Sequence, residues 1–344
     1  MTFFWVFIVA FLITRWLTPA AKQLALHTGI VDAPGERKIH KAPIPYLGGI
    51  AIYLGFLASL LWQAPLNAPL IGILVGSGFL IVLGVVDDRF AIKASWKLLG
   101  QIGVAVFTYF LGVGITYLVL PWGPVLALGK LSLPVTVIWV VGLINTMNLI
   151  DGMDGLATGI AAIGTCFLAV LAVEHIQFNV AFLSVALLGA TLGFLRYNFA
   201  PAQIFMGDTG SMFLGYALAC SAMMGVLKTD LPTGFFLPLI ILGVPIFDTL
   251  FAIVRRLKNK QGIFSPDKGH IHHRLLQAGM TQRQAAIFVY FTCMVLGLLA
   301  VFVSFLEPPY AFGLLGISLG LIASILLVPK FRSGTLAWLM RHFL

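Results

Sequence analysis

Long apolar runs alternate with short polar stretches along the whole chain. A helix that crosses a ~30 Å hydrocarbon core needs about 20 mostly apolar residues. Clusters of charged residues, Pro and Gly separate eleven segments of roughly this kind. They cover residues 2–20, 46–63, 69–86, 96–113, 132–147, 156–173, 178–195, 210–227, 234–254, 284–305 and 310–328. The stretch 115–131, with its Pro, Gly and alternating apolar residues, predicts a hairpin outside the membrane instead.

Composition supports a membrane protein. The 344 residues are 60% hydrophobic and 10% charged, whereas soluble domains carry roughly 25% charged residues. So few charges cannot cover a surface that faces water, which excludes a soluble globular protein. The cysteines Cys166, Cys220 and Cys293 lie singly in apolar stretches and indicate neither a disulfide framework nor a metal site. We therefore expect an all-α polytopic membrane protein with about eleven transmembrane helices, forming one integral membrane domain over residues 1–344.

The basic residues predict an orientation in the membrane. No basic residue precedes the first apolar segment, so we expect it to remain a transmembrane helix with its N-terminus outside. All lysines and arginines except Arg15, Lys130 and Lys228 then fall on the cytoplasmic side, as the positive-inside rule requires. The C-terminus is cytoplasmic in this topology. The predicted cytoplasmic loops cover about 21–45, 87–95, 148–155, 196–209 and 255–283.

Acidic residues concentrate on the same predicted side. Among the 12 acidic residues, Glu174, Asp230 and Glu307 alone face outward. Carboxylates at the ends of apolar spans are unfavourable, so a cluster of them indicates a function, although loop charges that merely solvate helix ends are the alternative. Asp87 and Asp88 end the third segment side by side. Their repulsion raises the pKa of one of them unless a cation intervenes, which suits a base or a neighbour of Mg²⁺.

Two further clusters follow apolar segments. Residues 148–155 read Asn-Leu-Ile-Asp-Gly-Met-Asp-Gly, where polar residues share a helical face and the glycines allow close approach of a ligand. An EF-hand calcium loop is excluded because its twelve-residue ligand series and its closing Glu are absent. The second cluster, residues 196–211, leads into the eighth segment, where Asp208 either binds a ligand or caps a helix together with Thr209 and Ser211.

Histidines and basic residues make up a fourth cluster. Residues 265–276 include His270, His272, His273 and Arg274. A zinc site and an anion site are the two interpretations, and the lack of a nearby cysteine favours phosphate. The chain has no Walker A loop and no dinucleotide-binding fingerprint. Carboxylates suited to Mg²⁺ and donors suited to phosphate at one membrane surface indicate an enzyme that acts on anionic, phosphate-containing substrates.

Together these motifs resemble the polyprenyl-phosphate N-acetylhexosamine-1-phosphate transferases, with their WecA/TagO-type and MraY-type branches. The resemblance rests on five motifs in order along the chain: residues 37–40 with 45–49, residues 87–88, 148–155, 205–211 and 270–274. It implies transfer of a sugar-1-phosphate from a UDP-sugar to a polyprenyl phosphate with release of UMP. The compact sequence His-Ile-His-His-Arg-Leu-Leu is similar to the WecA/TagO type. This implies UDP-N-acetylglucosamine as donor, undecaprenyl phosphate as acceptor, and a cell-surface glycan such as an O antigen or a teichoic acid as the final product.

The resemblance also implies roles for individual residues. The catalytic residues would be Asp87 as a base, Asp88 and His272, and the ligands of Mg²⁺ would be Asp208 and Asn148, with Mn²⁺ as a substitute. The residues that contact the nucleotide sugar would be Asp151, Asp154, Asn198, Phe205, His270, His273 and Arg274, and those that guide the prenyl phosphate would be Lys38 and His40. We expect an active site facing the cytoplasm in the inner membrane, a homodimer, and no nucleic-acid partner.

Three other interpretations stay open at this point. An MraY-type phospho-MurNAc-pentapeptide transferase differs in its donor. A secondary transporter places ionisable residues near the midplane on broken helices with an internal repeat, whereas here the acids lie at helix ends and no repeat is visible. A membrane scaffold without activity would not need the intact polar motifs. Mg²⁺-dependent release of UMP distinguishes the transferases from the last two.

Overall fold

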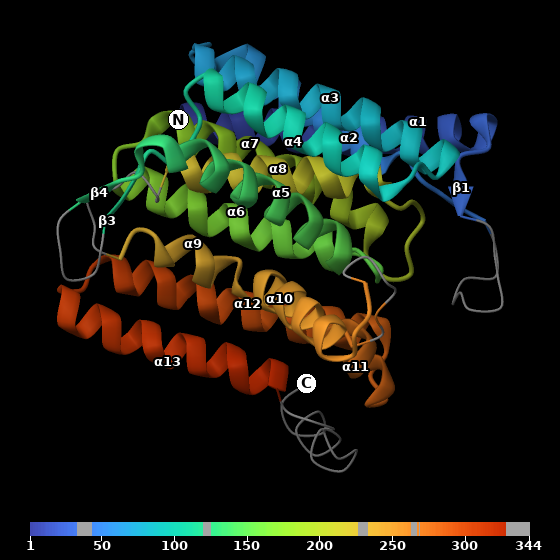
Figure 1. Cartoon of the computed structure of the whole chain (residues 1–344). Coiled ribbons are helices and arrows are strands. Elements are labelled where there is room, and N and C mark those ends of the chain that lie inside the picture. Colours follow the sequence, from blue (N-terminus) through green and yellow to red (C-terminus); the bar gives the residue numbers. More distant parts are fainter. Residues whose placement is uncertain (33–42, 120–124, 226–232, 263–266, 268, 328–344) are drawn as a thin grey trace.

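The computed structural model describes residues 1–32, 43–119, 125–225, 233–262, 267 and 269–327. Helices dominate this part of the chain (Figure 1). They are α1 (Thr2–Thr28), α2 (Gly48–Gln63), α3 (Ala68–Phe90), α4 (Ala94–Phe110), α5 (Ser132–Ile150), α6 (Leu156–Glu174), α7 (Phe178–Asn198), α8 (Gly207–Met224), α9 (Phe236–Ile241), α10 (Gly243–Lys258), α11 (Ile271–Gln277), α12 (Gln282–Ser304) and α13 (Pro308–Leu327). A short 3₁₀ helix, Gly129–Leu131, precedes α5.

Several of these helices are long and apolar enough to cross a membrane. Six stretches in the described part of the chain meet both conditions: α1, α3, residues 129–150, α6, α7 and α12. Within the described residues, ten of the eleven predicted apolar segments overlap one helix each and the ninth overlaps two, which confirms a mostly helical protein with several apolar helices. The number of eleven spans and their orientation stay predictions.

Helix α8 lies at the centre of the bundle and packs against α2, α3 and α5. Every residue of α8 except Asp208 and Met224 is buried. Glycine makes this close packing possible: a Cβ atom added at Gly84 of α3 would lie 2.3 Å from the Cα atom of Thr209, and one at Gly49 of α2 would lie 2.3 Å from the nitrogen of Gly210. The start of α8 is therefore held within contact distance of the backbones of α2 and α3.

The predicted ninth segment is wrong as a single helix. The chain breaks at Leu242 into the short α9 and the longer α10. Pro245 lies in the first turn of α10, where its missing N–H breaks no helical hydrogen bond, and it cannot lie in the middle of a continuous helix without loss of one. Because α10 is a separate helix, the direction of its buried face does not depend on that of α9. This face includes Asp248 and Arg256.

Loop boundaries also differ from the prediction. Helix α1 continues to Thr28 and ends at Gly29, whose φ of 70° is the left-handed conformation typical of a helix C-terminus. The predicted loop 21–45 is therefore shorter. The predicted loop 255–283 contains the last turn of α10 and all of α11.

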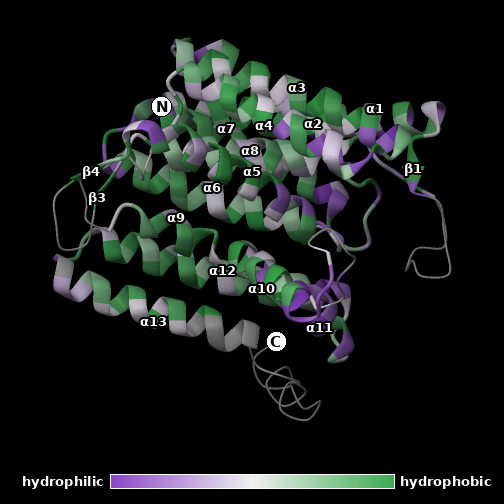
Figure 2. Ribbon diagram, viewed as in Figure 1, coloured by the Kyte–Doolittle hydropathy of each residue, from purple (hydrophilic) through white to green (hydrophobic). Residues whose placement is uncertain are grey.

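Two small antiparallel ribbons qualify the all-α prediction. Strands β3 (Tyr117–Val119) and β4 (Val125–Ala127) pair with Tyr117 opposite Ala127, which confirms the antiparallel pairing of the predicted hairpin, while its place outside the membrane stays a prediction. Strands β1 (Val31–Asp32) and β2 (Ile44–Pro45) pair after α1. Hydrophilic residues gather at the end of the bundle that carries β1 and α11, and we call this the polar end (Figure 2).

Candidate active site

Lys97 lies between two carboxylates at the polar end of the bundle. Its Nζ donates a hydrogen bond to Oδ2 of Asp87 at 2.8 Å and another to Oδ2 of Asp208 at 2.7 Å. Asp87 comes from the last turn of α3, Lys97 from the start of α4 and Asp208 from the first turn of α8. The side chains of Lys97 and Asp208 remain 24% and 27% exposed, so a ligand can reach this cluster.

Asp88 holds the start of α8. Its Oδ1 accepts a hydrogen bond from the backbone N–H of Asp208 at 2.9 Å, and its Oδ2 accepts from the backbone N–H and hydroxyl of Thr209 at 3.2 and 2.6 Å. The residue before α8, Met206, provides no capping side chain, so α3 supplies the cap. A carboxylate there also interacts favourably with the helix dipole. These contacts give Asp88 a structural part, and its catalytic role stays a prediction.

Gly207 lets Asp88 reach this position. Its φ is 70°, a left-handed conformation that side chains disfavour. A Cβ atom added there would lie 2.4 Å from Oδ2 of Asp88. The Gly-Asp sequence at residues 207–208 thus allows the contact between α3 and α8. The alternative in which Asp208 caps its own helix does not hold, because the Asp208 carboxylate faces Lys97 and Asn148 instead.

Asn148 fixes the second oxygen of Asp208. Its Nδ2 donates to Oδ1 of Asp208 and to Oγ of Ser211, both at 2.9 Å. The predicted pair Asn148 and Asp208 is therefore side by side. The amide nitrogen, which cannot bind a metal, is the atom that faces Asp208, so Asn148 would bind a metal only through its other amide atom, Oδ1.

Acidic side chains of the loop after α5 face the same cluster. Burial, and then the negative charges of Asp208, Asp88 and Asp154, hold the pKa of Asp151 well above its usual range. The Oδ2 of Asp154 accepts a hydrogen bond from the backbone N–H of Ala202 at 2.8 Å, which ties this loop to the one before α8. Asp151 thus interacts electrostatically with the carboxylates of the site, and Asp154 holds in place the loop that borders the site.

Asn198 is buried and makes its described hydrogen bonds inside the protein. Its Oδ1 accepts from the hydroxyl of Thr158 at 2.7 Å, and its Nδ2 donates to the carbonyl of Ile204 at 3.0 Å. Because both polar atoms of the amide hold the loop before α8 against α6, the observed function of Asn198 is structural. Its contact with a base stays a prediction.

Phe205 lies on the segment that leads into α8. Its backbone N–H donates to the carbonyl of Pro45 at 2.8 Å, and its carbonyl accepts from the N–H of Gly48 at 3.0 Å. The ring is half-buried, and its centroid lies 5.9 Å from that of Tyr46. The start of α2 and the start of α8 therefore present an aromatic pair beside the cluster.

The histidine motif is anchored by a residue that the sequence prediction did not include. Asp248, buried on α10, accepts a hydrogen bond from the backbone N–H of Ile271 at 2.9 Å, and its other oxygen lies 2.8 Å from Nδ1 of His270. A single carboxylate thus binds both the side chain before α11 and the first N–H of that helix. His270 is buried in this pairing and serves to position α11.

His272 connects α11 with the acidic loop. A Cβ atom added at Gly152 would lie 2.5 Å from Nε2 of His272, so the ring rests on that glycine. Its Nδ1 is buried with no hydrogen-bond partner among the described residues. Burial and the charges of His273 and His270, opposed by Asp248, lower the pKa of His272 to about 4. His272 is therefore neutral at pH 7. In this form its ring can donate one hydrogen bond and accept another, but it carries no positive charge.

The other predicted positions are placed less closely. His273 and Arg274 are half-buried on α11, and the ring centroid of His273 lies 4.2 Å from that of His272. Lys38 and His40 lie outside the described residues, so their contact with a prenyl phosphate stays a prediction.

Sequence analysis missed Lys97 and Asp248 because both lie inside apolar segments. Lys97 is in the first turn of the predicted segment 96–113, and Asp248 is near the end of segment 234–254. A charged residue inside such a segment is itself a signal, because it is rarely tolerated there without a partner. That signal identifies both positions but not their partners.

The donor set is compatible with Mg²⁺. Among the described residues, no group of three or more His, Cys, Asp or Glu side chains is arranged as a metal site. Mg²⁺, however, is usually bound through one or two carboxylates together with waters and substrate phosphates. Asp87 and Asp208 supply such carboxylates. With Asp88 and Asp151 nearby and Lys97 as the counter-ion, the cluster favours a further cation.

Comparison with known proteins identifies the family of the chain. A model of glycosyl transferase family 4 matches residues 70–226, a range that holds Asp87, Lys97, Asn148 and Asp208. A protein of Bacillus subtilis named "Probable undecaprenyl-phosphate N-acetylglucosaminyl 1-phosphate transferase" is 43% identical over 286 residues, which are 83% of this chain and 80% of that protein.

Two further relatives have similar names. The "Decaprenyl-phosphate N-acetylglucosaminephosphotransferase" of Mycolicibacterium smegmatis is 34% identical over 358 residues, covering 95% of this chain and 88% of that protein. The "Undecaprenyl-phosphate alpha-N-acetylglucosaminyl 1-phosphate transferase" of Escherichia coli is 29% identical over 289 residues, covering 81% and 78%. The chain belongs to glycosyl transferase family 4.

Proposed function

We propose that this protein transfers N-acetylglucosamine-1-phosphate from UDP-N-acetylglucosamine to undecaprenyl phosphate. The observation that carries the proposal is the cluster in which Lys97 joins Asp87 and Asp208 at the polar end of an apolar helix bundle. A water-soluble nucleotide sugar can approach this end from solvent, and a lipid phosphate can approach it from the membrane. The names of the relatives in the same family support this donor and acceptor.

The reaction exchanges one phosphoanhydride partner of the sugar-1-phosphate, UMP, for another, the prenyl phosphate. An oxygen of the prenyl phosphate attacks the phosphorus that carries the sugar, and the bond from that phosphorus to the bridging oxygen of the diphosphate breaks. UMP leaves with the bridging oxygen and its electron pair, and the lipid-linked pyrophosphate sugar remains. A phosphate monoester has its second pKa near ~6, so the attacking oxygen is largely ionised at neutral pH. Positioning therefore matters more than removal of a proton.

Negative charge is the main electrostatic problem of this site. The substrates bring two phosphate groups of the donor and one of the acceptor to a cluster with more carboxylates than cations. Mg²⁺ would be held by Asp208, with Asp87 and Asn148 beside it, and when bound it neutralises the negative charge of the phosphates. Lys97 reaches both carboxylates and keeps them apart at defined positions. Mn²⁺ is expected to substitute.

The remaining site residues suit the nucleotide sugar. The aromatic pair Phe205 and Tyr46 offers a face on which a uracil ring can stack. His272 is neutral and has an unpartnered buried Nδ1, so it can hydrogen-bond to a polar group of the donor. His273 and Arg274 lie on the same short helix and extend this side of the site. Asp151 and Asp154 lie on the loop between α5 and α6, between the aromatic pair and the histidines of α11.

The cellular setting belongs to the same proposal. The excess of basic residues at one side of the predicted spans supports a cytoplasmic active site in the inner membrane. The product would be the first lipid-linked intermediate of a cell-surface glycan, such as an O antigen or a teichoic acid. A homodimer is part of the expectation from the family.

The decisive experiment measures UMP release and the mass of the lipid product. Purified protein in detergent is given undecaprenyl phosphate and Mg²⁺ with UDP-N-acetylglucosamine, UDP-N-acetylgalactosamine or UDP-MurNAc-pentapeptide in separate reactions, and with EDTA as a control. We expect product with UDP-N-acetylglucosamine and none with EDTA. Product with the pentapeptide donor alone would assign the MraY-type reaction, and no UMP from any donor in a folded, monodisperse sample would contradict the proposal.

A further inference from the structure

Tyr290 of α12 forms a hydrogen bond with the end of the loop that carries Asp151 and Asp154. Its hydroxyl donates to the carbonyl of Gly155 at 2.6 Å. Gly155 is the residue before α6, and its φ is 73°. The same carbonyl accepts the N–H of Gly159 at 2.9 Å in the first turn of that helix. Tyr290 therefore fixes the point at which the acidic loop becomes a helix.

Helix α6 leaves space for the tyrosine ring. A Cβ atom added at Gly159 would overlap with the ring of Tyr290, and one added at Gly155 would lie 3.3 Å from its hydroxyl. The two glycines are one helical turn apart. They form a slot on α6, and a side chain at Gly159 would displace the ring from it.

Phe199 extends the contact that Tyr290 makes. The centroids of the two rings lie 6.3 Å apart, which is within the range of aromatic pairs. Phe199 directly follows α7, and the Cα atom of Phe199 would lie 3.1 Å from a Cβ atom at Gly155. Arg283 lies 5.7 Å above the Phe199 ring, but it is exposed, so this contact contributes little. We call the contact among Gly155, Phe199 and Tyr290 the aromatic clamp.

The helix that carries Tyr290 is joined to the histidine helix by a short connection. Helix α11 ends at Gln277, and α12 begins at Gln282. Between them the backbone N–H of Met280 donates to the carbonyl of Leu275 at 3.2 Å, and the Met280 side chain is buried. The position of α12 therefore determines where the end of α11 lies.

Helix α11 depends on its neighbours for its place. It has seven residues, which is too short for a helix that is stable alone. Asp248 binds its start, and the connection to α12 holds its end. His272 of α11 rests on Gly152, three residues before Gly155. The acidic loop thus contacts α11 at one end and α12 at the other, and the two contacts together determine how far His272 lies from the loop.

We propose that Tyr290 is a positioning residue of the transfer reaction, which holds His272 against the loop of Asp151 through α12 and α11. The inference rests on the proposed function and adds a residue that acts through His272 instead of touching the substrates itself. A displacement of ~1 Å at the reacting groups can lower a rate by about a hundredfold. A partial loosening of α11 should therefore be measurable in kcat.

Tyr290→Phe removes the hydroxyl and keeps the ring in its slot. The Gly155 carbonyl retains the hydrogen bond from Gly159, so no buried acceptor is left unpaired and the variant should fold. We expect kcat for UMP release to fall about five- to twentyfold, and the KM for UDP-N-acetylglucosamine to change by less than about twofold. Misalignment affects the transition state more than the binding of the substrate.

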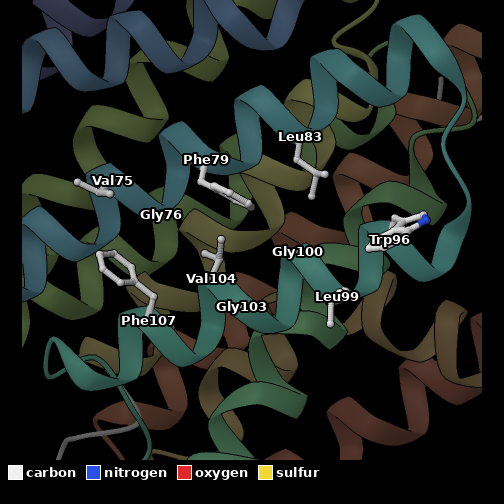
Figure 3. A pocket seen from close by; sticks show the side chains of 10 residues that line it. All are labelled: Val75, Gly76, Phe79, Leu83, Trp96, Leu99, Gly100, Gly103, Val104 and Phe107. Carbon is white, nitrogen blue, oxygen red and sulfur yellow. The ribbon is translucent and has the colours of Figure 1, made fainter.

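Tyr53→Phe is the matched control. The Tyr53 hydroxyl also donates to a main-chain carbonyl, that of Leu74 on α3, at 3.1 Å. Leu74 precedes Val75, which lies at the end of the apolar groove between α3 and α4 opposite Trp96 (Figure 3). The residues that line this groove all come from α3 and α4, and none of them takes part in the clamp.

Comparison of the two variants separates positioning from stability. Each loses one hydrogen bond from a hydroxyl to a carbonyl, so we expect similar decreases in Tm and a decrease in kcat in Tyr290→Phe alone. Equal kcat of the two variants in an active enzyme would overturn the positioning role and leave the proposed function intact.

A double-mutant cycle shows whether Tyr290 acts through His272. His272→Ala removes the side chain that the clamp holds in place. In that background, Tyr290→Phe should lower the residual kcat by less than about twofold, because residues that act as a unit are not additive. An equal loss with and without His272 would overturn the assignment.

Hydrogen–deuterium exchange measures the hold on α11 without turnover. Peptides that cover residues 151–159 and 270–280 are compared in the wild type, Tyr290→Phe and Tyr53→Phe. We expect exchange in both segments to be at least about threefold faster in Tyr290→Phe alone, because local opening becomes more favourable. Unchanged exchange in Tyr290→Phe would overturn the proposal. If the wild-type protein releases no UMP, the proposed function fails, and exchange alone then decides whether Tyr290 holds α11.

Discussion

Asp208 is the residue on which the site depends most, because each of its carboxylate oxygens has a different partner. Oδ2 accepts from Lys97 and Oδ1 accepts from Asn148. Asp208→Asn keeps the shape but removes the charge that holds Lys97 and would attract a cation. We expect UMP release to fall by at least about a hundredfold, as for loss of one preorganised electrostatic group. Turnover assays and thermal unfolding together measure this.

Glu174→Gln is the matched control for that variant. Glu174 ends α6 at the opposite end of the bundle and hydrogen-bonds to Ser304. Its neutralisation should leave UMP release unchanged. Activity of Asp208→Asn close to that of the wild type, with both proteins folded, would rule out Asp208 as the centre of the site.

The raised pKa of Asp151 makes the stability of the folded protein depend on pH. Its pKa is raised well above the unfolded value of about 4. Between those two values the folded protein holds a proton that the unfolded chain has released, so Asp151 makes the free energy of unfolding decrease as pH rises. Asp151→Asn removes this effect. We expect its Tm at pH 8 to exceed that of the wild type by about 2 °C or more, with a smaller difference at pH 5, while UMP release falls.

Measuring Tm at several pH values decides whether burial of the charge is the cause. A Tm difference between Asp151→Asn and the wild type that is constant from pH 5 to pH 8 would show that the substitution acts through packing. A lower Tm of the variant at pH 8 would mean that the carboxylate is stabilised by partners other than those described.

At the scale of elements, the connection between α3 and α8 is the main determinant of the site. Asp88 accepts two backbone hydrogen bonds and one hydroxyl hydrogen bond at the start of α8, and Asp208 lies directly in that turn. We expect Asp88→Ala to destabilise the protein by about 1–2 kcal/mol, the range for loss of a helix cap. It should also lower kcat strongly, because Asp208 moves with the end of the helix.

A second helix cap separates stability from catalysis. Thr281 caps α12 through a reciprocal pair of hydrogen bonds with Gln284 at an exposed position. Thr281→Ala should cost about 1 kcal/mol and leave kcat unchanged. If both variants lose stability and neither loses activity, Asp88 is a cap alone and does not position Asp208.

The sequence pattern predicted most helices because apolar length depends only on local composition. It could not predict the break between α9 and α10, since residues 234–254 are apolar apart from Asp248 and Thr249, and a proline can start a helix as well as interrupt one. It also placed the end of α1 too early, because the polar residues after position 20 belong to a helix that continues to Thr28.

The site was predicted in its location more than in its contacts. Charged and polar residues stand out among apolar segments, and the structure brings together the motifs at residues 87–88, 148–155 and 205–211 at the polar end. The sequence does not show which helix lies next to which, so it identifies neither the contacts of Lys97 nor the cap that Asp88 provides for α8. For Asn198, the sequence predicts a contact with the nucleotide sugar, and the structure shows an amide that holds the loop before α8 in place.

At the scale of the whole molecule, the asymmetry of charge should determine how the protein lies in the membrane. The polar end carries the Lys97 cluster, α11 and the exposed end of α10, whereas the opposite end carries the hairpin of β3 and β4. From the positive-inside rule we expect the polar end to face the cytoplasm and the hairpin to face outward. A UDP-sugar made in the cytoplasm can reach the site in that orientation only.

Single cysteines labelled with a membrane-impermeant maleimide test this orientation. Cys166, Cys220 and Cys293 are first replaced by alanine, and one cysteine is then introduced at Leu126 of β4 or at Gln261 after α10, which are both exposed. In intact spheroplasts we expect labelling of Leu126→Cys, and labelling of Gln261→Cys after permeabilisation only. The reverse pattern would place the polar end outside and would contradict the proposed cytoplasmic orientation of the active site.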